Sequence, residues 1–486
     1  MSTTRSFGWV FGGTLLQILL QFLLQRTFAS LFGAAADMDA YRAALTFPAA
    51  ISGMLVGTIV PILIPKVADG KNLVVVPPIL VIVGGSTIFL CVLAYFFVEQ
   101  IAAGWLAGFD GVRKQSFINV FRILIWLLPA NSMLGVLQGL HHSQKSFALP
   151  VIAGALGPLA TLIIMRVYAP EYGTMACAYA TLVGAYLNLV IQSPIVLAIL
   201  PERSKGAIRD LLPMFQRSFP VLASMIVLKL DPFVERYVLA FHGPGNIAHL
   251  DYAVQITTIF ISLSSGALST VAFPQLASAW SQGSKAIEKE VAGTFRTFIL
   301  LIVPAVVVMT FFSHALVKDL FETGEFGRSD TNQVAMILQV YTCMIVGAGI
   351  GEITTKILYV FQDTWTPMWI GSGLILVGMI VKVLIVPQGT LMTYVWVVGL
   401  VYFPGTLLSL VAVYWRIGTG MFDGLGSAFG VAVSGSILAA LIGKLVLNST
   451  LPFSGVTGLI AGGLAYLLFA WGAMQLCQPN EDCADC

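Results

Sequence analysis

DAYRAALTFPAAISGMLVGTIVPILIPKVADG, residues 39–70, and DYAVQITTIFISLSSGALSTVAFPQLASAWSQG, residues 251–283, are two versions of one pattern. Each begins with an acid closely followed by a tyrosine, passes through small residues, and reaches a hydrophobic residue and a proline before a polar turn. Each also follows a long apolar stretch and a short loop that contains glycine. Such internal repeats are typical of secondary transporters, whose substrate site lies between the halves near the bilayer midplane. The pattern therefore predicts two related halves.

The composition around these repeats is that of a membrane protein. Hydrophobic residues make up 58% of the 486 residues and charged residues only 10%, and the mean hydropathy is +0.90. A soluble domain has about 25% charged residues, so this chain cannot cover a water-facing surface. The small net charge of +2 gives no reason to expect a nucleic-acid partner.

The chain is predicted to be an all-α polytopic membrane protein. About 20 apolar residues are needed for one helical crossing of the hydrocarbon core, and the first apolar stretch is interpreted as a retained transmembrane helix rather than a signal peptide. Fourteen spans are predicted near residues 7–32, 39–66, 73–98, 117–140, 148–168, 173–199, 214–241, 247–275, 293–315, 331–361, 366–387, 390–414, 425–447 and 453–477.

The repeat divides these spans into two six-helix lobes and two extra helices. The predicted parts are an N-terminal lobe at 1–200, a charged linker at 201–213, a C-terminal lobe at 214–416, two further helices at 417–477 and a tail at 478–486.

Lysine and arginine in short loops set the orientation, because they are in excess on the cytoplasmic side. With a cytoplasmic N-terminus, the inner side holds Arg5, Lys66, Lys71, Lys145, Arg203, Lys205, Arg209, Arg217, Lys285, Lys289, Arg296 and Arg416. The outer side then holds Arg113, Lys114, Arg166, Lys318 and Arg328. Both chain ends are therefore predicted to be cytoplasmic.

Polar side chains within the predicted spans concentrate on the first two helices of each half. Such groups are costly in hydrocarbon and usually face a cavity or one another. Three glutamines at i, i+4 and i+8 share one face of the first helix. The candidates for substrate contact are Gln17, Gln21, Gln25, Arg26, Asp39, Arg42, Lys229, Asp231, Glu235, Arg236 and Gln255.

Purely structural roles are the alternative for each group. The glutamines could bond neighbouring helices, as amides in membranes do. Asp39 and Arg42 could pair, or Asp39 could be the N-cap of its own helix. The charges between residues 229 and 236 could neutralise one another. Glu352 and Lys356, with the acid four residues first, are predicted to form a structural ion pair.

The sequence holds no sign of a soluble enzyme. It has no Walker loop, no HExxH, no G-x-S-x-G and no strand-based dinucleotide fingerprint. Cys477, Cys483 and Cys486 lie close together but have no fourth ligand, so neither a metal nor a cofactor is predicted. A transporter is favoured over an intramembrane glycosyltransferase, which would need a large outer loop with a catalytic carboxylate.

Five motifs in order resemble the MurJ/MviN family of the multidrug/oligosaccharidyl-lipid/polysaccharide exporter superfamily. They are LFGAAADMDAYRAALTFP (31–48), ERYVLAFHGPG (235–245), LDYAVQ (250–255), FETGEF (321–326) and KILYVFQDTWTP (356–367). The resemblance covers nearly the whole chain. It implies a transporter, not an enzyme, that flips lipid II, a polyprenyl-diphosphate-linked saccharide, across the bacterial inner membrane for peptidoglycan synthesis.

The resemblance further implies two lobes around a cationic cavity, a groove for the lipid tail on the last two helices, and alternating access driven by a coupling ion or the membrane potential. Membrane lipids would be its other partners. A flippase for another envelope polysaccharide, or a cation-coupled small-molecule exporter of the same superfamily, is the alternative.

The match is incomplete at the cavity. Asp39, Glu235 and Arg236 fit the family pattern, but the family arginines of spans 1, 2 and 8 fall here on the glutamine stripe, on AAISGML (49–55) and on Gln255. We expect Arg26 and Arg42 to substitute in part, and together with the cations of span 7 to attract the diphosphate. The acids would partner these cations in the empty site. Glutamine suits sugar hydroxyls better than phosphate, so the cargo headgroup could differ from standard lipid II.

Overall fold

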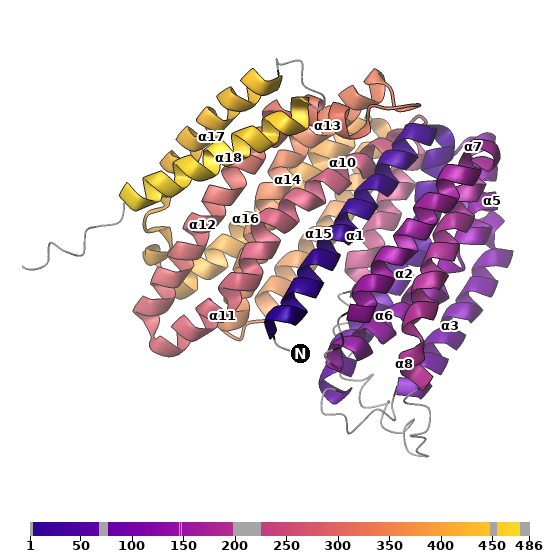
Figure 1. Ribbon diagram of the computed structural model, residues 1–486, viewed down its shortest axis with the longest axis horizontal. Coiled ribbons are helices and arrows are strands. Elements are labelled where there is room, and N and C mark those ends of the chain that lie inside the picture. Colours follow the sequence, from indigo (N-terminus) through magenta and orange to yellow (C-terminus); the bar gives the residue numbers. More distant parts are fainter. Residues whose placement is uncertain are drawn as a thin grey trace, which may run out of the picture. The chain divides into compact units, whose positions relative to one another are not determined.

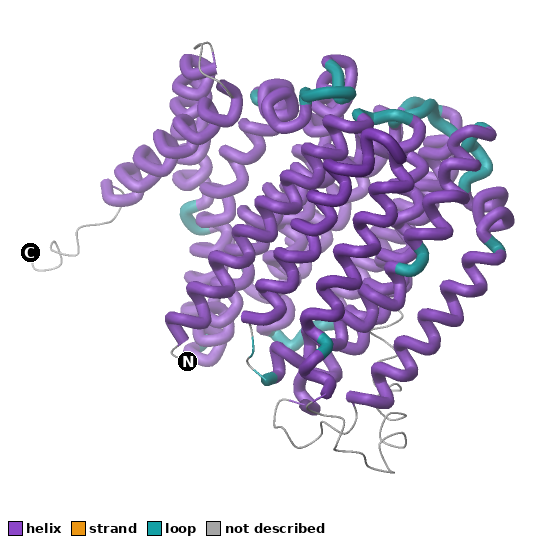
Figure 2. The backbone as a smooth tube through the Cα atoms, turned by 45° about the vertical axis from the view of Figure 1, so that its right-hand side comes forward, coloured by secondary structure: helices purple, strands orange, loops and turns teal. Residues whose placement is uncertain are grey.

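The computed structural model describes residues 3–67, 76–144, 146, 148–197, 225–447 and 454–476. Within these residues every regular element is a helix, and loops join them (Figure 2). The prediction of an all-α polytopic fold is confirmed. The linker at 201–213 and the tail at 478–486 lie outside the described residues. The lobes at 1–200 and 214–416 and the added helices at 417–477 stay a prediction, because they rest on the sequence repeat.

The backbone forms two compact units. The first comprises Met1–Ala248 and Thr323–Phe326. Its helices are α1 (Thr3–Phe32), α2 (Ala36–Val67), α3 (Val76–Phe96), α4 (Val98–Trp105), α5 (Gly111–Leu124), α6 (Leu127–Ser143), α7 (Ala148–Gln192) and α8 (Pro194–Leu197). A further helix at 225–240 belongs to the same unit.

The second unit comprises His249–Glu322 and Gly327–Cys486. It contains all but the first three residues of α10 (Asn246–Ile261), then a π-helix η2 (Ser262–Gly266), α11 (Ala267–Gln282), α12 (Ser284–Phe311), α13 (Ser313–Phe321), α14 (Arg328–Val360), α15 (Trp365–Ile385), η3 (Val386–Gln388), α16 (Leu391–Ile417), η4 (Thr419–Phe422), α17 (Leu425–Leu447) and α18 (Ser454–Leu476). The last two helices lie side by side, next to α12 (Figure 1).

Each of the fourteen predicted spans corresponds to helix in the described residues. Among the residues that the structure describes, ten helices are long and apolar enough to cross a membrane, and α5 with α6 adds one more as a pair bent by 40°. The remaining difference has local causes. α7 holds two predicted spans, which meet at Gly173, whose φ of 59° and ψ of −145° break the helix. The span at α1 counts only as a shorter apolar helix, Leu16–Phe32, and the span at 214–241 is described only from residue 225.

Large apolar side chains cover the outside of the helices. Phe89 and Phe96 on α3 and Leu384 on α15 are more than half exposed, and Trp415 on α16 is 81% exposed. Surface aromatic and aliphatic side chains at this density would aggregate in water but are stable against lipid. The chain is therefore a multi-pass membrane protein.

Two of the quoted motifs meet in the first unit. The α1–α2 turn contains Gly33 at φ +55°, where a Cβ would lie 2.5 Å from the carbonyl oxygen of Glu325. In return, a Cβ on Gly324 would lie 2.1 Å from the carbonyl oxygen of Ser30. The Glu325 amide donates to the same Ser30 carbonyl at 3.1 Å. Both glycines are required because two backbones touch there.

Candidate functional site

The helix at 225–240 packs antiparallel along α2 and carries two cations to it. A Cβ added to Gly53 would lie 3.3 Å from the Lys229 ammonium nitrogen, and one on Gly57 would lie 3.1 Å from the Met225 sulfur. Seven residues beyond Lys229, the Arg236 Nε donates to the Thr46 hydroxyl at 3.2 Å. Glycines four residues apart let membrane helices approach closely. The close approach places Lys229 and Arg236 on one side of α2.

Arg236 is held on two sides although it is only 7% exposed. Its Nη1 lies 2.9 Å from a carboxylate oxygen of Glu235, and its Nε bonds Thr46 on α2. Of the charges between residues 229 and 236 that could neutralise one another, Glu235 and Arg236 therefore form an ion pair. Lys229 makes no ion pair with any acid of the described residues, and it is half-buried.

The predicted glutamine stripe divides into three different environments. Gln17 donates its amide to the Val151 carbonyl of α7 at 3.0 Å, as a residue that joins two helices would. Gln25 accepts a hydrogen bond from Arg42 on α2. Gln21, between them, is exposed. Two glutamines of the stripe therefore hydrogen-bond to other helices, Gln17 to α7 and Gln25 to α2.

Arg42 is aimed along the face that α2 shares with α1. Besides its bond to Gln25, its guanidinium lies over the Phe28 ring, 5.3 Å from the centroid. Aromatic stacking and an amide partner orient a guanidinium. Arg42 lies on α2 one turn before Thr46, the residue that accepts a hydrogen bond from Arg236.

Asp39 caps a helix far away in sequence. Its carboxylate accepts from the Gly245 amide at 2.7 Å and from the Ala248 amide at 2.9 Å. These amides lie at the N-terminus of α10, where Gly245 has no side chain to serve as the cap. The alternative that Asp39 caps its own helix is wrong, because α2 begins three residues earlier at Ala36.

The remaining candidates are Arg26, Asp231 and Gln255. Arg26 lines a pocket between α1 and α7 together with Arg166 of α7. Asp231 is half-buried, two residues after Lys229, and two residues on a helix point to different faces. Gln255 is half-buried on α10 and belongs to the second unit.

The predicted ion pair of Glu352 and Lys356 is wrong. Glu352 on α14 accepts hydrogen bonds from Ser265 and Ser269 instead, and Lys356 turns its amino group toward the Phe273 ring, 5.8 Å from the centroid. No ion pair joins the two in the part of the chain that the structure describes. The serine-rich segment SLSSGALS at 262–269 could have indicated hydroxyl donors for this carboxylate, but the ion-pair prediction did not consider it.

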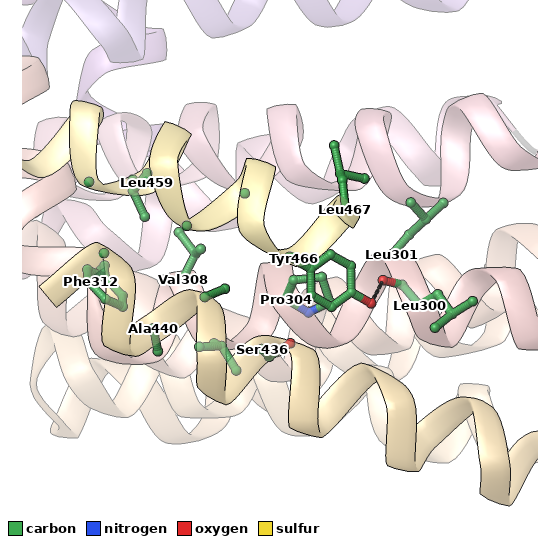
Figure 3. A pocket seen from close by; sticks show the side chains of 16 residues that line it. Leu300, Leu301, Pro304, Val308, Phe312, Ser436, Ala440, Leu459, Tyr466 and Leu467 are labelled. Atoms are coloured by element: carbon green, nitrogen blue, oxygen red, sulfur yellow. Dashed lines mark hydrogen bonds between the residues drawn. The ribbon is translucent and has the colours of Figure 1, made fainter. Parts of the chain in front are cut away.

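The second unit also contains an apolar groove among α12, α17 and α18 (Figure 3). It has a volume of about 250 Å³. Pro304, Val308 and Phe312 form one wall, and Ala440 and Leu459 form the others. Tyr466 closes one end by donating its hydroxyl to the Leu300 carbonyl. α17 and α18 correspond to the two helices that were predicted to follow the repeat. Together with α12 they line this groove.

The described residues contain no candidate metal site. In the described residues no three His, Cys, Asp or Glu side chains are grouped so that they could hold an ion. Cys477, Cys483 and Cys486 lie outside the described residues. The polar face on α2 offers hydrogen-bond donors and positive charge, which is suited to binding anions.

The sequence is similar to known lipid-flipping proteins along most of its length. A family model described as lipid II flippase MurJ matches residues 28–459. The lipid II flippase MurJ of Burkholderia cenocepacia is 26% identical over 411 residues, 80% of this chain and 79% of the relative. A probable lipid II flippase MurJ of Buchnera aphidicola is 21% identical over 376 residues, 73% of each chain.

Solved structures agree on the fold. A lipid II flippase MurJ in an inward closed conformation superposes with a TM-score of 0.81 at 19% identity, covering 96% of this chain and 99% of the other. An inward-facing multidrug resistance transporter of the MATE family gives 0.66 at 14% identity, covering 85% and 96%. Because the family model spans most of the sequence, the chain belongs to the lipid II flippase MurJ family.

Proposed function

We propose that this protein is a flippase that moves lipid II across the bacterial inner membrane by alternating access. Family membership supports the choice of cargo. The observation that carries the proposal is the cationic face on α2, which is formed by Arg42, Lys229 and Arg236. On this face the half-buried Lys229 ammonium lies against Gly53 and forms no ion pair with an acid of the described residues. A charge kept in hydrocarbon without neutralisation is costly unless it serves a ligand.

The cations of this face suit a diphosphate. Two opposite unit charges about 4 Å apart attract by about 4 kcal/mol at an effective dielectric constant of about 20, and by about 1 kcal/mol in water. Arg42 can offer two parallel donors to a phosphate, and Lys229 acts as a point charge. Glu235 would hold Arg236 in place when the site is empty.

Lys229 also compensates for a missing arginine. The α2 segment at 49–55 has no charged residue, although the family resemblance places arginines there. The Lys229 side chain arrives at this segment from the opposite helix. We propose that positive charge is thereby restored at the same place, and that Gln21 and Gln25 face the sugar part of the cargo.

The lipid tail of the cargo would occupy the groove among α12, α17 and α18. Its walls are almost wholly apolar, so a hydrocarbon tail would be held there by van der Waals packing, as between helices within a membrane. A polyprenyl chain longer than the groove would extend into the bilayer. No enzymatic step is proposed, because transport changes no covalent bond of the cargo.

We further propose that both chain ends are cytoplasmic and that the two repeat-related lobes rock about the cargo. The excess of Lys and Arg on one set of loops supports this orientation. A coupling ion or the membrane potential would drive the cycle. Cysteine labelling from either side of the membrane at Lys318 and Lys285, each replaced by cysteine, tests the orientation, which is wrong if both sites label from the same side.

The decisive experiment is lipid II flipping in proteoliposomes by Lys229→Gln, with Lys444→Gln as the control. Lys444 is an exposed lysine near the end of α17. A hydrogen bond to a charged group contributes about 1.5–3 kcal/mol, so Lys229→Gln should weaken lipid II binding by about ten-fold or more. Native mass spectrometry against other polyprenyl-diphosphate glycans measures both affinity and cargo choice. Unchanged binding in Lys229→Gln, or preference for another glycan, would contradict the proposal.

A further inference from the structure

Glu352 lies in a second polar site, which the proposed function does not use. Its Oε2 accepts from the Ser265 hydroxyl at 2.9 Å, and its Oε1 accepts from the Ser269 hydroxyl at 2.8 Å. The two serines are 0% and 2% exposed, and Glu352 is half-buried. An ionisable side chain within a membrane helix points to function and needs a named partner.

A local irregularity of the backbone presents these serines. Ser262–Gly266 form a π-helix between α10 and α11. Such single-turn π-helices are rare and frequent at functional sites. Ser265 ends up four residues before Ser269, so that both hydroxyls lie on one face toward α14. The π-helix supplies Ser265 and the first turn of α11 supplies Ser269, so that each oxygen of a single carboxylate has one donor.

The hydroxyl protons can be arranged in two ways. Ser265 Oγ also lies 3.0 Å from the Ile261 carbonyl oxygen, and Ser269 Oγ lies 3.1 Å from the Gly266 carbonyl oxygen. Each hydroxyl has one proton for two acceptors. With Glu352 ionised, both protons point to the carboxylate. With Glu352 protonated, it donates to one serine, which turns its own proton to the backbone. Every group keeps a partner in both states.

Charged groups elsewhere do not neutralise this carboxylate. Lys356, one turn along α14, lies over Phe273, and neither η2 nor α11 carries a charged residue. The charged and titratable groups on the other helices in contact with α14, and on α10, are His249, Asp251, Tyr252, Lys285, Glu288, Lys289, Glu290, Arg296, His314, Lys318, Asp319, Lys382, Tyr394, Tyr402, Tyr414 and Arg416. Among the described residues, none of these forms an ion pair with Glu352.

We propose that Glu352, with Ser265 and Ser269, is the proton-binding site that couples transport to a proton gradient. This inference rests on the proposed flippase function. A proton adds to the carboxylate from one side of the membrane and leaves to the other, so the site alternates between carboxylate and carboxylic acid. Neutralisation removes the cost of a charge in hydrocarbon and releases one serine to its own helix, and this biases the α14 contact with η2 and α11 between two arrangements.

The direct test is an infrared titration of the purified protein, which reads the carbonyl stretch of protonated carboxyl groups without any cargo. The wild type should gain a band on acidification that is absent from Glu352→Gln and retained in Glu171→Gln, in which an exposed glutamate is changed. Ser265→Ala with Ser269→Ala should move the same transition to higher pH, because the ionised form loses both donors. Absence of a Glu352-dependent band, or a band abolished by sodium at constant pH, overturns the proposal.

The second test is transport under an imposed pH gradient with the membrane potential clamped. Glu352→Gln should lose the stimulation of flipping by the gradient, whereas Glu171→Gln should keep it. Thermal unfolding checks that Glu352→Gln, a substitution of equal size, is folded. If the wild type does not flip lipid II, the proposed cargo fails, and the infrared titration still decides the proton site.

Discussion

Asp39 shows how a residue chosen for chemistry can serve architecture. It was predicted to contact substrate, yet its two oxygens accept from Gly245 and Ala248 at the start of α10. A carboxylate at a helix N-terminus is favoured by the helix dipole as well as by the hydrogen bonds. The glycine at the capping position has a φ of 87° and no side chain of its own. Asp39 therefore substitutes, from a helix about 200 residues away, for the missing cap.

Replacing Asp39 should destabilise the protein rather than only alter cargo binding. Asp39→Ala leaves two amides without an acceptor at a site that is 1% exposed at Asp39. A lost N-cap costs about 1 kcal/mol, and buried unsatisfied donors cost about 1–3 kcal/mol each. Thermal unfolding in detergent should therefore show a clear fall in Tm. Asp37→Ala, at an exposed position two residues earlier, serves as the control and should unfold like the wild type. Equal Tm values in Asp39→Ala and the control would contradict the capping role.

At the scale of elements, two glycines of α2 lie at its contact with the helix at 225–240. A Cβ on Gly53 meets the end of Lys229, and one on Gly57 meets the sulfur of Met225. Both neighbours are flexible ends of side chains, which can shift by a few tenths of an ångström. The helix pair should therefore accept alanine at either position. An alanine at position 53 would displace the charged end of Lys229, whereas an alanine at position 57 would displace the uncharged thioether of Met225.

This difference gives a matched pair of variants. Gly53→Ala should push the Lys229 ammonium away from the face of α2 and reduce lipid II binding, with little change in Tm. Gly57→Ala should move only Met225 and leave binding near the wild-type value. Binding by native mass spectrometry and unfolding are measured on the same samples. If both variants lose binding equally, helix packing rather than the position of the charge controls the site.

The turn between α14 and α15 is predicted to confer pH-dependent stability. Asp363 accepts from the hydroxyl and the amide of Thr366 at 2.6 and 3.0 Å and from Arg416 of α16 at 2.6 Å. The Thr366 hydroxyl foremost, then its amide and the Arg416 charge, lower the pKa of Asp363 below its usual value. A carboxyl whose pKa is lower in the folded chain stabilises the fold above its unfolded pKa, about 3.9.

Asp363→Asn should therefore lower Tm at neutral pH. The stabilisation is lost as pH falls through the folded-state pKa, so the Tm difference between wild type and variant should shrink below about pH 4. Thermal unfolding across this range measures the effect. Asp423→Asn, which changes an exposed acid near η4, is the comparison and should show a smaller difference at neutral pH. A difference that grows on acidification would contradict the interpretation.

At the scale of the whole molecule, each unit carries a different part of the proposed task. The first unit holds the cationic face on α2 and the capped start of α10. The second holds the apolar groove and the Glu352 site. The cargo has the same two kinds of surface, because its diphosphate–sugar headgroup is polar and its lipid tail is apolar. Cargo recognition would therefore be divided between polar and apolar surfaces on separate units.

Filling the groove tests this division. Ala440→Trp places a large ring among α12, α17 and α18 and should reduce flipping of cargo with a full polyprenyl tail. Leu441→Trp, one residue on, changes a side chain that is 59% exposed to the outside and should leave flipping intact. A short-chain analogue of the cargo should be affected less by Ala440→Trp than the long-chain form. Equal loss for both chain lengths would indicate damage to the helix packing instead.

The sequence by itself determined the membrane class, the helical spans and the family. Hydrocarbon requires long apolar helices, and long apolar stretches are visible without a structure. The repeat at 39–70 and 251–283 and the five ordered motifs could be read for the same reason. The candidate residues on α2 and at 225–240 followed from the cost of charge in lipid.

Only the tertiary structure decided the partner of each polar residue. The position of Glu352 in the sequence favoured Lys356, four residues away, but its hydrogen bonds come from Ser265 and Ser269, and Ser265 is 87 residues away. Nor did the sequence indicate that Asp39 would accept from the amide of Gly245, which is 206 residues away. Spacing along one helix predicts neighbours on that helix, whereas the packing of separate helices sets contacts between distant segments. The same packing separated Gln17, which joins α1 to α7, from Gln25, which holds Arg42.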